Sequence, residues 1–265
     1  MPGGSDASLY TLAEMTNEPS NQPQRGFANV YDDQARADAY ATLEFPGTYF
    51  LAYRDLPAII GEHVHGKSAL DFGCGAGRST RFLRKLGFDV VGVDISEAML
   101  ARARERDPGG DYRLIADGDV GSLPSGTYDL VLSVFTFDNI DTREKKVTLF
   151  RGLAGLLKSG GRIVSLVSSP DIYVNEWASF STKKFPQNRS ARSGDKVLIV
   201  MLDVEDPRPV EDILWTDEAY NEVYEGAGLS VIATYRPLGK PGEAQSWVSE
   251  TKIAPWVVYV LGPKA

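Results

Sequence analysis

The chain has 265 residues, a length that fits one large domain or one domain with a smaller lid. Its 36 acidic residues outnumber the 28 basic ones, and the net charge of -8 argues against a nucleic acid as partner. The single cysteine excludes an internal disulfide and a metal site built from several cysteines. The sequence has no apolar run of membrane-spanning length and no signal-peptide pattern, so we expect a cytoplasmic protein that does not bind membranes.

The first 65 residues precede the main pattern of the chain. Residues 1–26 are rich in Gly, Ser, Asn, Gln and Pro without a sustained period, which predicts a mobile arm. Residues 27–65 carry apolar and aromatic positions at helical spacing, with a break at Pro46 and Gly47. This segment therefore predicts a helical cap of two helices ahead of the main fold.

Strand and helix patterns alternate from residue 66 onward, which predicts a parallel sheet with helices on both faces. Residues 170–215 break this rhythm with four prolines and a β-like run at 196–204, so we expect an inserted lid over the sheet edge. The predicted strands are 68–72, 89–93, 112–115, 128–133, 162–168, 229–235 and 256–261, and the predicted helices are 78–86, 96–106, 143–157 and 216–225.

The most informative motif joins the first predicted strand to the helix after it. Asp71 is followed by three alternate glycines, Gly73, Gly75 and Gly77, and Asp94 ends the second predicted strand. Glycines let the backbone turn sharply and approach a ligand, and a carboxylate at the position of Asp94 can accept both hydroxyls of a ribose. The pattern predicts a nucleoside-bearing cofactor.

The glycine spacing selects among such cofactors. A dinucleotide fingerprint would need a glycine at position 78, where this chain has Arg78. The Gly-x-Gly-x-Gly spacing behind Asp71 instead resembles motif I of class I S-adenosylmethionine-dependent methyltransferases. Four later segments resemble that family in the same order, so that the resemblance covers about residues 66–169: the second strand and its helix at 91–99, a Gly-Asp step at 118–120, the fourth strand at 128–133 and the fifth at 156–164.

The resemblance implies S-adenosylmethionine as cofactor, with S-adenosylhomocysteine as product. It also implies an α/β fold, a Rossmann-like, doubly wound, mostly parallel seven-stranded sheet of order 3-2-1-4-5-7-6, whose last strand is antiparallel. Asp94 would bind the ribose, and Asp119, or alternatively Asp117, the adenine. Cys74 is expected to serve packing. The residues expected around the cofactor are Tyr31, Tyr40, Asp71, Gly73, Cys74, Gly75, Gly77, Arg78, Asp94, Ile95, Met99, Asp117, Gly118, Asp119, Val120, Ser133, Val134 and Phe135.

The acceptor is expected beyond the carboxyl ends of the fourth and fifth strands, where ligands of such sheets bind. Asp138 could accept a proton from a hydroxyl or orient an amine, although it could equally cap a turn. We take Asp138 and Ser168 as catalytic candidates. The residues expected to contact the acceptor are Tyr49, Phe137, Asn139, Tyr173, Trp177 and Lys184.

The charges of the insertion have two interpretations. The segment around residues 183–192 is locally basic, which would suit an acidic acceptor or a solvated loop. Glu211, Asp212 and Glu250 could attract an amine, but we expect them to be surface charges. Core packing is the alternative role for the aromatic residues of this region.

The leading hypothesis is a methyltransferase that acts on a small-molecule acceptor of specialised metabolism, with oxygen favoured over nitrogen or carbon because Asp138 offers a base. We expect a monomer or homodimer, no metal, and residues 66–265 as the catalytic domain. Two alternatives stay open: a non-catalytic protein that binds S-adenosylmethionine, and a Rossmann oxidoreductase that uses a nicotinamide dinucleotide. Methylation of a nucleic acid is disfavoured, because residues 133–138 lack the family motif for base amino groups.

Overall fold

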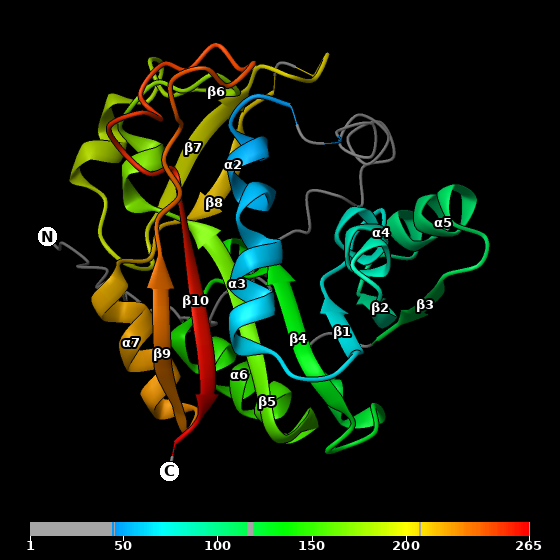
Figure 1. Ribbon diagram of the computed structural model, residues 1–265. Helices are drawn as coiled ribbons and strands as arrows, with labels where there is room; N and C mark the ends of the chain where they lie inside the picture. Colours follow the sequence, from blue (N-terminus) through cyan, green and yellow to red (C-terminus); the bar gives the residue numbers. More distant parts are fainter. Residues whose placement is uncertain (1–43, 45, 116–118, 207, 265) are drawn as a thin grey trace, which may run out of the picture.

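The computed structural model describes residues 44, 46–115, 119–206 and 208–264 (Figure 1). A seven-stranded sheet forms its centre, in the order β3-β2-β1-β4-β5-β10-β9. The strand β10 runs antiparallel to both of its neighbours, and the other pairs are parallel. The predicted strand order is therefore confirmed. The strands are β1 (Ser68–Phe72), β2 (Asp89–Asp94), β3 (Asp111–Leu114), β4 (Tyr128–Val134), β5 (Leu157–Ser168), β9 (Leu229–Tyr235) and β10 (Trp256–Pro263).

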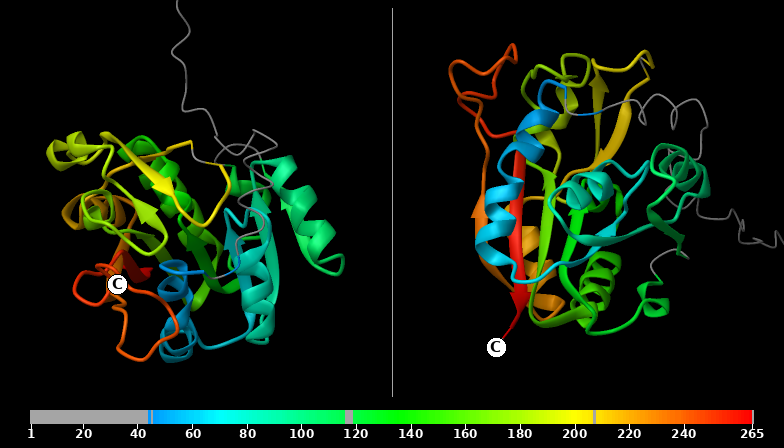
Figure 2. Two further views of the ribbon diagram at one scale, coloured as in Figure 1. Left: turned by 90° about the horizontal axis from the view of Figure 1, so that it is seen from above. Right: turned by 45° about the vertical axis from the view of Figure 1, so that its right-hand side comes forward.

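Both faces of the sheet are buried, as the near-continuous apolar runs of its strands require. Along β4, Leu130 and Leu132 pack into the core on one face, while Val131 packs into the core on the other. The helices α2, α3 and α4 contribute to the first core, and α6 and α7 to the second (Figures 1 and 2). The helices are α2 (Tyr49–Arg54), α3 (Leu56–His63), α4 (Arg78–Lys85), α5 (Glu97–Arg106), α6 (Arg143–Leu156) and α7 (Asp217–Gly226).

The N-terminal cap differs in detail from the sequence prediction. The break at Pro46 and Gly47 precedes α2, and a further break at Asp55 separates α2 from α3. Pro57 lies in the first turn of α3, where a residue without an N–H group is tolerated, so a new helix begins there. The predicted arm at residues 1–26 and most of the first cap helix lie outside the described residues.

The insertion after β5 forms a second, three-stranded antiparallel sheet of β6 (Phe180–Ser181), β7 (Lys196–Met201) and β8 (Val210–Ile213). A short 3-10 turn, η4 (Pro170–Tyr173), precedes it, and a second, η5 (Pro186–Ser190), lies between β6 and β7. This small sheet lies above the carboxyl ends of β4 and β5 in Figure 1. The insertion therefore covers the region where the sequence places the acceptor. In the described part of the chain, no helix is long and apolar enough to cross a membrane.

Candidate functional site

The loop after β1 contains three glycines, and at two of them, Gly73 and Gly77, a side chain would clash. Gly73, Gly75 and Gly77 have φ values of 73°, 52° and 77°, in the left-handed region. A Cβ atom on Gly73 would lie 2.1 Å from Oγ1 of Thr136, and one on Gly77 would lie 2.6 Å from the hydroxyl of Tyr112. The backbone N–H of Gly73 donates to the carbonyl of Val93 at 2.9 Å, which holds the loop across the ends of β1 and β2.

Asp71, the acid of this motif, is fully buried at the end of β1. Its Oδ2 accepts hydrogen bonds from the hydroxyls of Ser79 at 2.7 Å and Thr80 at 2.6 Å, both on α4. Its Oδ1 is buried and has no hydrogen-bond partner among the described residues. Burial raises the pKa of Asp71 to about 6, although the two hydroxyls oppose this shift. An acceptor atom left without a donor beside a glycine loop fits a site that receives a ligand.

Asp94 ends β2 and turns its carboxylate toward the glycine loop. Its Oδ2 accepts from the N–H of Gly75 at 2.8 Å, and its Oδ1 accepts from the N–H of Ser96 at 2.9 Å. Beside it, Ile95 is exposed and Met99 is buried, with the Met99 methyl 3.1 Å from the place of a Cβ on Gly75. A carboxylate next to open apolar surface suits a ribose joined to a base.

The remaining residues predicted at the cofactor fall into three groups. Asp119 is exposed and caps the 3-10 turn η2 (Val120–Ser122), while Val120 is buried beneath it. Arg78 lies over the rings of Tyr49 and Tyr53, at 5.1 and 5.4 Å from their centres, and so ties α4 to α2. The predicted residues that lie outside the described part of the chain are Tyr31, Tyr40, Asp117 and Gly118.

Cys74 and Ser133 show how tightly the loop is enclosed. Burial raises the pKa of the Cys74 thiol well above its usual value, which makes this residue an unreactive packing group. Ser133, near the end of β4, is buried, and its hydroxyl has no partner among the described residues. Val134 follows it half-buried.

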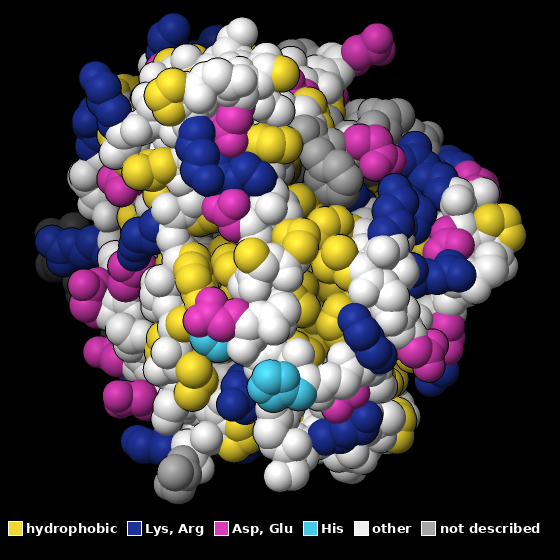
Figure 3. Space-filling view, viewed as in Figure 1, with side chains coloured by type: hydrophobic (Ala, Val, Ile, Leu, Met, Phe, Trp, Pro, Cys, Tyr) yellow, Lys and Arg dark blue, Asp and Glu magenta, His cyan; other side chains and the backbone are white. Residues whose placement is uncertain are grey.

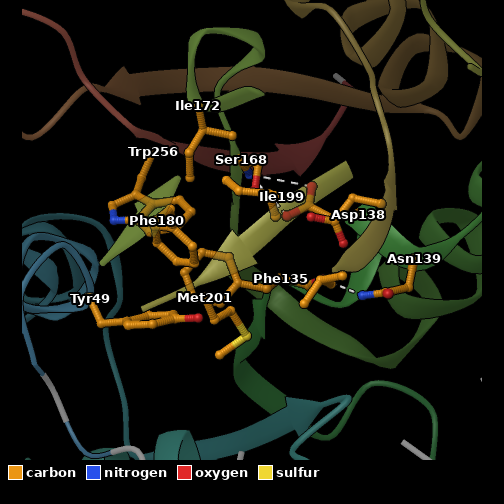
Figure 4. A pocket seen from close by; sticks show the side chains of 12 residues that line it. Tyr49, Phe135, Asp138, Asn139, Ser168, Ile172, Phe180, Ile199, Met201 and Trp256 are labelled. Atoms are coloured by element: carbon orange, nitrogen blue, oxygen red, sulfur yellow. Dashed lines mark hydrogen bonds between the residues drawn. The ribbon is translucent and has the colours of Figure 1, made fainter. Parts of the chain in front are cut away.

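A cavity opens beyond β4 and β5 (Figure 4). Its walls come from α2, the end of β4, the end of β5, the insertion and β10. Apolar side chains gather near the middle of the face that carries α2 and α3 (Figure 3). The lining residues are Tyr49, Phe135, Asp138, Asn139, Ser168, Ile172, Phe180, Ile199, Met201, Val210, Asp212 and Trp256.

Four aromatic rings form one side of this cavity. The ring of Tyr49 has its centre 5.1 Å from that of Phe180, 5.9 Å from that of Trp256 and 6.0 Å from that of Phe135. Phe135 has a φ of 61°, a conformation that is strained for a side chain of this size. Such strain is typical of functional sites, and here it places an aromatic ring in the cavity wall, against Tyr49 and Trp256.

Asp138 supplies one carboxyl group of the polar side. The N–H of Ser168 donates to its Oδ2 at 3.0 Å (Figure 4). The hydroxyl of Tyr220 donates to its Oδ1 at 3.5 Å. Lys146 of α6 is buried behind it, donates to the carbonyl of Phe137 and lies 4.8 Å from the ring centre of Trp215. Burial raises the pKa of Asp138 and lowers that of Lys146, while their mutual attraction opposes both shifts.

Asp212 on β8 supplies a second carboxyl group, although the sequence predicts it at the surface. That prediction is wrong: Asp212 lines the cavity, and its Oδ2 accepts from the hydroxyl of Tyr173 at 3.1 Å. Burial and the neighbouring charge of Asp138 raise its pKa to about 7. The period of two along a strand could have signalled this position, because Val210 and Asp212 share one face. Glu211 pairs instead with Lys196, at 2.7 Å.

Glu250 is the second acid wrongly expected at the surface. It is fully buried, and its Oε1 accepts from the hydroxyl of Thr48 and from the N–H of Ala178, both at 2.7 Å. Trp256 completes the junction, because its Nε1 donates to the carbonyl of Thr48 at 2.9 Å. Glu250 therefore joins the start of α2 to the insertion, two segments that carry cavity walls. The sequence contains no local signal for this role.

The residues predicted to contact the acceptor divide between the cavity and its surroundings. Tyr49 and Asn139 line it, as do the two catalytic candidates Asp138 and Ser168. Three others are buried behind the lining: Phe137 stacks on Phe150, Tyr173 reaches Asp212, and Trp177 donates to the carbonyl of Ile172. Lys184 is exposed and is not among the lining residues. Among the described residues, no group of acids, histidines and cysteines could hold a metal ion.

Comparisons with known proteins agree on one kind of chemistry. A family described as a methyltransferase domain matches residues 70–165. The cypemycin N-terminal methyltransferase of a Streptomyces species is 28% identical over 66% of this chain and 74% of its own length. A ubiquinone biosynthesis O-methyltransferase of Pseudomonas aeruginosa is also 28% identical, over 66% and 71%. The CcbJ methyltransferase of Streptomyces caelestis has the same fold, with a TM-score of 0.63, 19% identity, and coverage of 89% of this chain and 98% of its own.

Proposed function

Because the chain belongs to the class I S-adenosylmethionine-dependent methyltransferase family, we propose that it methylates a small molecule bound in the cavity beyond β4 and β5. S-adenosylmethionine, when bound, supplies a methyl group on a sulfonium, which is an electrophile. The family also decides against the nicotinamide-dinucleotide oxidoreductase. The single observation that carries the proposal is a cavity that combines an aromatic side with two carboxyl groups and is lined by Phe135, whose neighbour Thr136 contacts the glycine loop.

The residues on the cofactor side suit this donor. Asp94 would accept the ribose hydroxyls, and Ile95 and Met99 would pack against the base. The unpartnered oxygen of Asp71 and the exposed carboxylate of Asp119 would accept from donor groups of the ligand. Each of these residues acts by binding and orienting, so the protein contributes alignment and a pocket that excludes water.

The acceptor site supports a small ligand over a macromolecule. The insertion covers the cavity, and apolar side chains such as Ile199, Met201 and Phe180 line it. A carboxyl group whose pKa is raised by burial can take a proton from a hydroxyl or from an ammonium near neutral pH. The sequence favours an oxygen acceptor over nitrogen or carbon because of Asp138 alone. Asp212 adds a second carboxyl group to the cavity, and two carboxyl groups suit an amine as well as a hydroxyl. The preference for oxygen therefore loses its basis.

Transfer of a labelled methyl group tests the proposal. The full chain is incubated with methyl-labelled S-adenosylmethionine and a library of small phenols, alcohols and amines, and we expect the label in a small-molecule product. Tight binding of S-adenosylhomocysteine without transfer to any acceptor would favour the non-catalytic alternative. A role in specialised metabolism, a monomeric or homodimeric state and the absence of a nucleic acid partner remain predictions.

General base catalysis by Asp138 is tested separately. If Asp138 takes the acceptor's proton, Asp138→Asn lowers kcat by roughly 10²-fold or more, the range of general base catalysis. If turnover is unchanged, Asp138 is not the base. Glu211→Gln is the control, because Glu211 carries a charge in the same region and does not line the cavity.

A further inference from the structure

Two carboxyl groups, buried Asp138 and partly buried Asp212, lie at the polar end of the cavity with buried Lys146 behind Asp138, and the charges of these three groups do not balance. Lys146 compensates Asp138, whose pKa it lowers through its charge. Asp212 has the hydroxyl of Tyr173 as hydrogen-bond partner, and within the described residues no basic side chain forms an ion pair with it. When all three groups are ionised, the cluster has one negative charge in excess. A ligand with a single positive charge would neutralise it.

One polar side chain that lines the cavity has an acceptor atom without a donor. The amide nitrogen of Asn139 donates to the carbonyl of Phe135 at 3.2 Å, which leaves its Oδ1 as an acceptor (Figure 4). That oxygen is buried and has no hydrogen-bond partner in the described part of the chain. Buried acceptors without donors are costly, so a ligand with several N–H groups fits this end better than one with a single hydroxyl.

The opposite side of the cavity suits the same ligand. The faces of aromatic rings attract cations, and apolar surface takes up the carbon skeleton of the ligand. Phe135 and Trp256, with ring centres 4.6 Å apart, form the closest ring pair of this wall. Carboxyl groups at one end and rings at the other are therefore complementary to an organic cation with an apolar body.

We propose that the acceptor is an organic amine, which binds as an ammonium ion with its N–H groups on Asp212 and Asn139 and its apolar body against Phe135 and Trp256. The inference rests on the proposed function and names its substrate class. A neutral alcohol would leave the excess negative charge uncompensated, and an acidic acceptor would be repelled by it. Before transfer the ammonium must lose one proton, for which Asp138 is the proposed base; the freed lone pair of the nitrogen then forms the N–C bond as the S–C bond of the donor breaks, which gives the N-methylated amine and S-adenosylhomocysteine.

Binding of two probes of equal shape tests this inference without any methyl transfer. Calorimetry at pH 8, with S-adenosylhomocysteine present, compares 2-phenylethylamine with 2-phenylethanol. We expect the amine to bind at least tenfold more tightly. In Asp212→Asn the preference should fall below threefold, whereas Glu211→Gln, on the same strand with its charge paired to Lys196, should retain it. The melting temperature of each variant confirms that it is folded.

Equal binding of the two probes in the unaltered protein, or an amine preference that persists in Asp212→Asn, overturns the inference. The proposed function fails separately. If labelled methyl groups are transferred to alcohols or phenols and not to amines, the small-molecule methyltransferase stands and the amine is wrong. If amines bind with the expected preference and no small acceptor is ever methylated, the recognition stands and the proposed function is wrong.

Discussion

The glycine loop after β1 and the cavity beyond β4 and β5 are held together by different kinds of contact. Around the loop, the two carboxylates have partners near in sequence: Ser79 and Thr80 are eight and nine residues from Asp71, and Gly75 is 19 residues from Asp94. Thr136, which contacts Gly73 from 63 residues away, is the distant exception. Around the cavity, rings from α2, β6, β10 and Phe135, the residue after β4, meet, and contacts between these regions join segments up to 208 residues apart. The proposed donor side is therefore held mainly by local contacts, and the proposed acceptor side depends on how the insertion packs.

The largest expected effect comes from adding a Cβ atom to the glycine loop. Gly73→Ala combines a left-handed φ with a Cβ 2.1 Å from Thr136, and should lower the free energy of unfolding by about 2 to 4 kcal/mol. It should also abolish binding of S-adenosylhomocysteine. Gly87→Ala is the matched control, because its φ is 81° and no atom lies within 4 Å of the added Cβ. Equal losses in urea unfolding for both variants would mean that the contact with Thr136 imposes no constraint.

A charge change on the donor side should affect that side alone. Asp94→Asn keeps the shape of the side chain and removes the charge that accepts from Gly75 and Ser96, and we expect S-adenosylhomocysteine to bind about 10- to 100-fold more weakly. The binding of 2-phenylethylamine should change less than threefold. Asp89→Asn, at the exposed start of the same strand, is the control for calorimetry. A larger effect on the amine than on the cofactor would contradict the division into two sides.

The pH dependence of stability reports on the acceptor side. The folded-state pKa of Asp212 is raised to about 7, above its unfolded value, so its contribution to stability is present at low pH and is lost as pH rises through about 7. Asp212→Asn should therefore gain stability relative to the unaltered protein between pH 5 and pH 9, by roughly 1 to 2 kcal/mol after a discount for partial solvent exposure. Urea unfolding across this range measures the difference. A difference that does not vary with pH would contradict a buried, uncompensated carboxyl group.

The smallest effect is expected outside both regions. Lys184 is exposed and is not among the residues that line the cavity, so Lys184→Ala should change stability by less than about 0.5 kcal/mol. The affinity for 2-phenylethylamine should also stay within twofold. If this variant instead weakened binding of an acidic probe such as 3-phenylpropionate, the basic segment around residues 183–192 would belong to the acceptor site. The division of the site into a glycine loop and a cavity would then need a third region.

The sequence by itself determined the order of the main sheet and the residues of the proposed donor side. The three alternate glycines, the acid before them and Asp94 act through backbone geometry and short-range contacts, which spacing along the chain conveys directly. The alternation of strands and helices constrains the topology, because crossover connections in parallel sheets follow few routes. These features require no knowledge of which distant segments meet.

Only the tertiary structure decided the acceptor side. Whether a charged side chain is exposed or buried depends on the segments that pack around it, and for Asp212 and Glu250 these are the turn η4 with Tyr173 and the start of α2 with Thr48. Lys146 reads as an ordinary surface lysine of an amphipathic helix, yet α6 places it behind Asp138. Burial in a low-dielectric interior then sets the pKa of each group, so the chemistry of this side arises from packing that spacing along the chain does not encode.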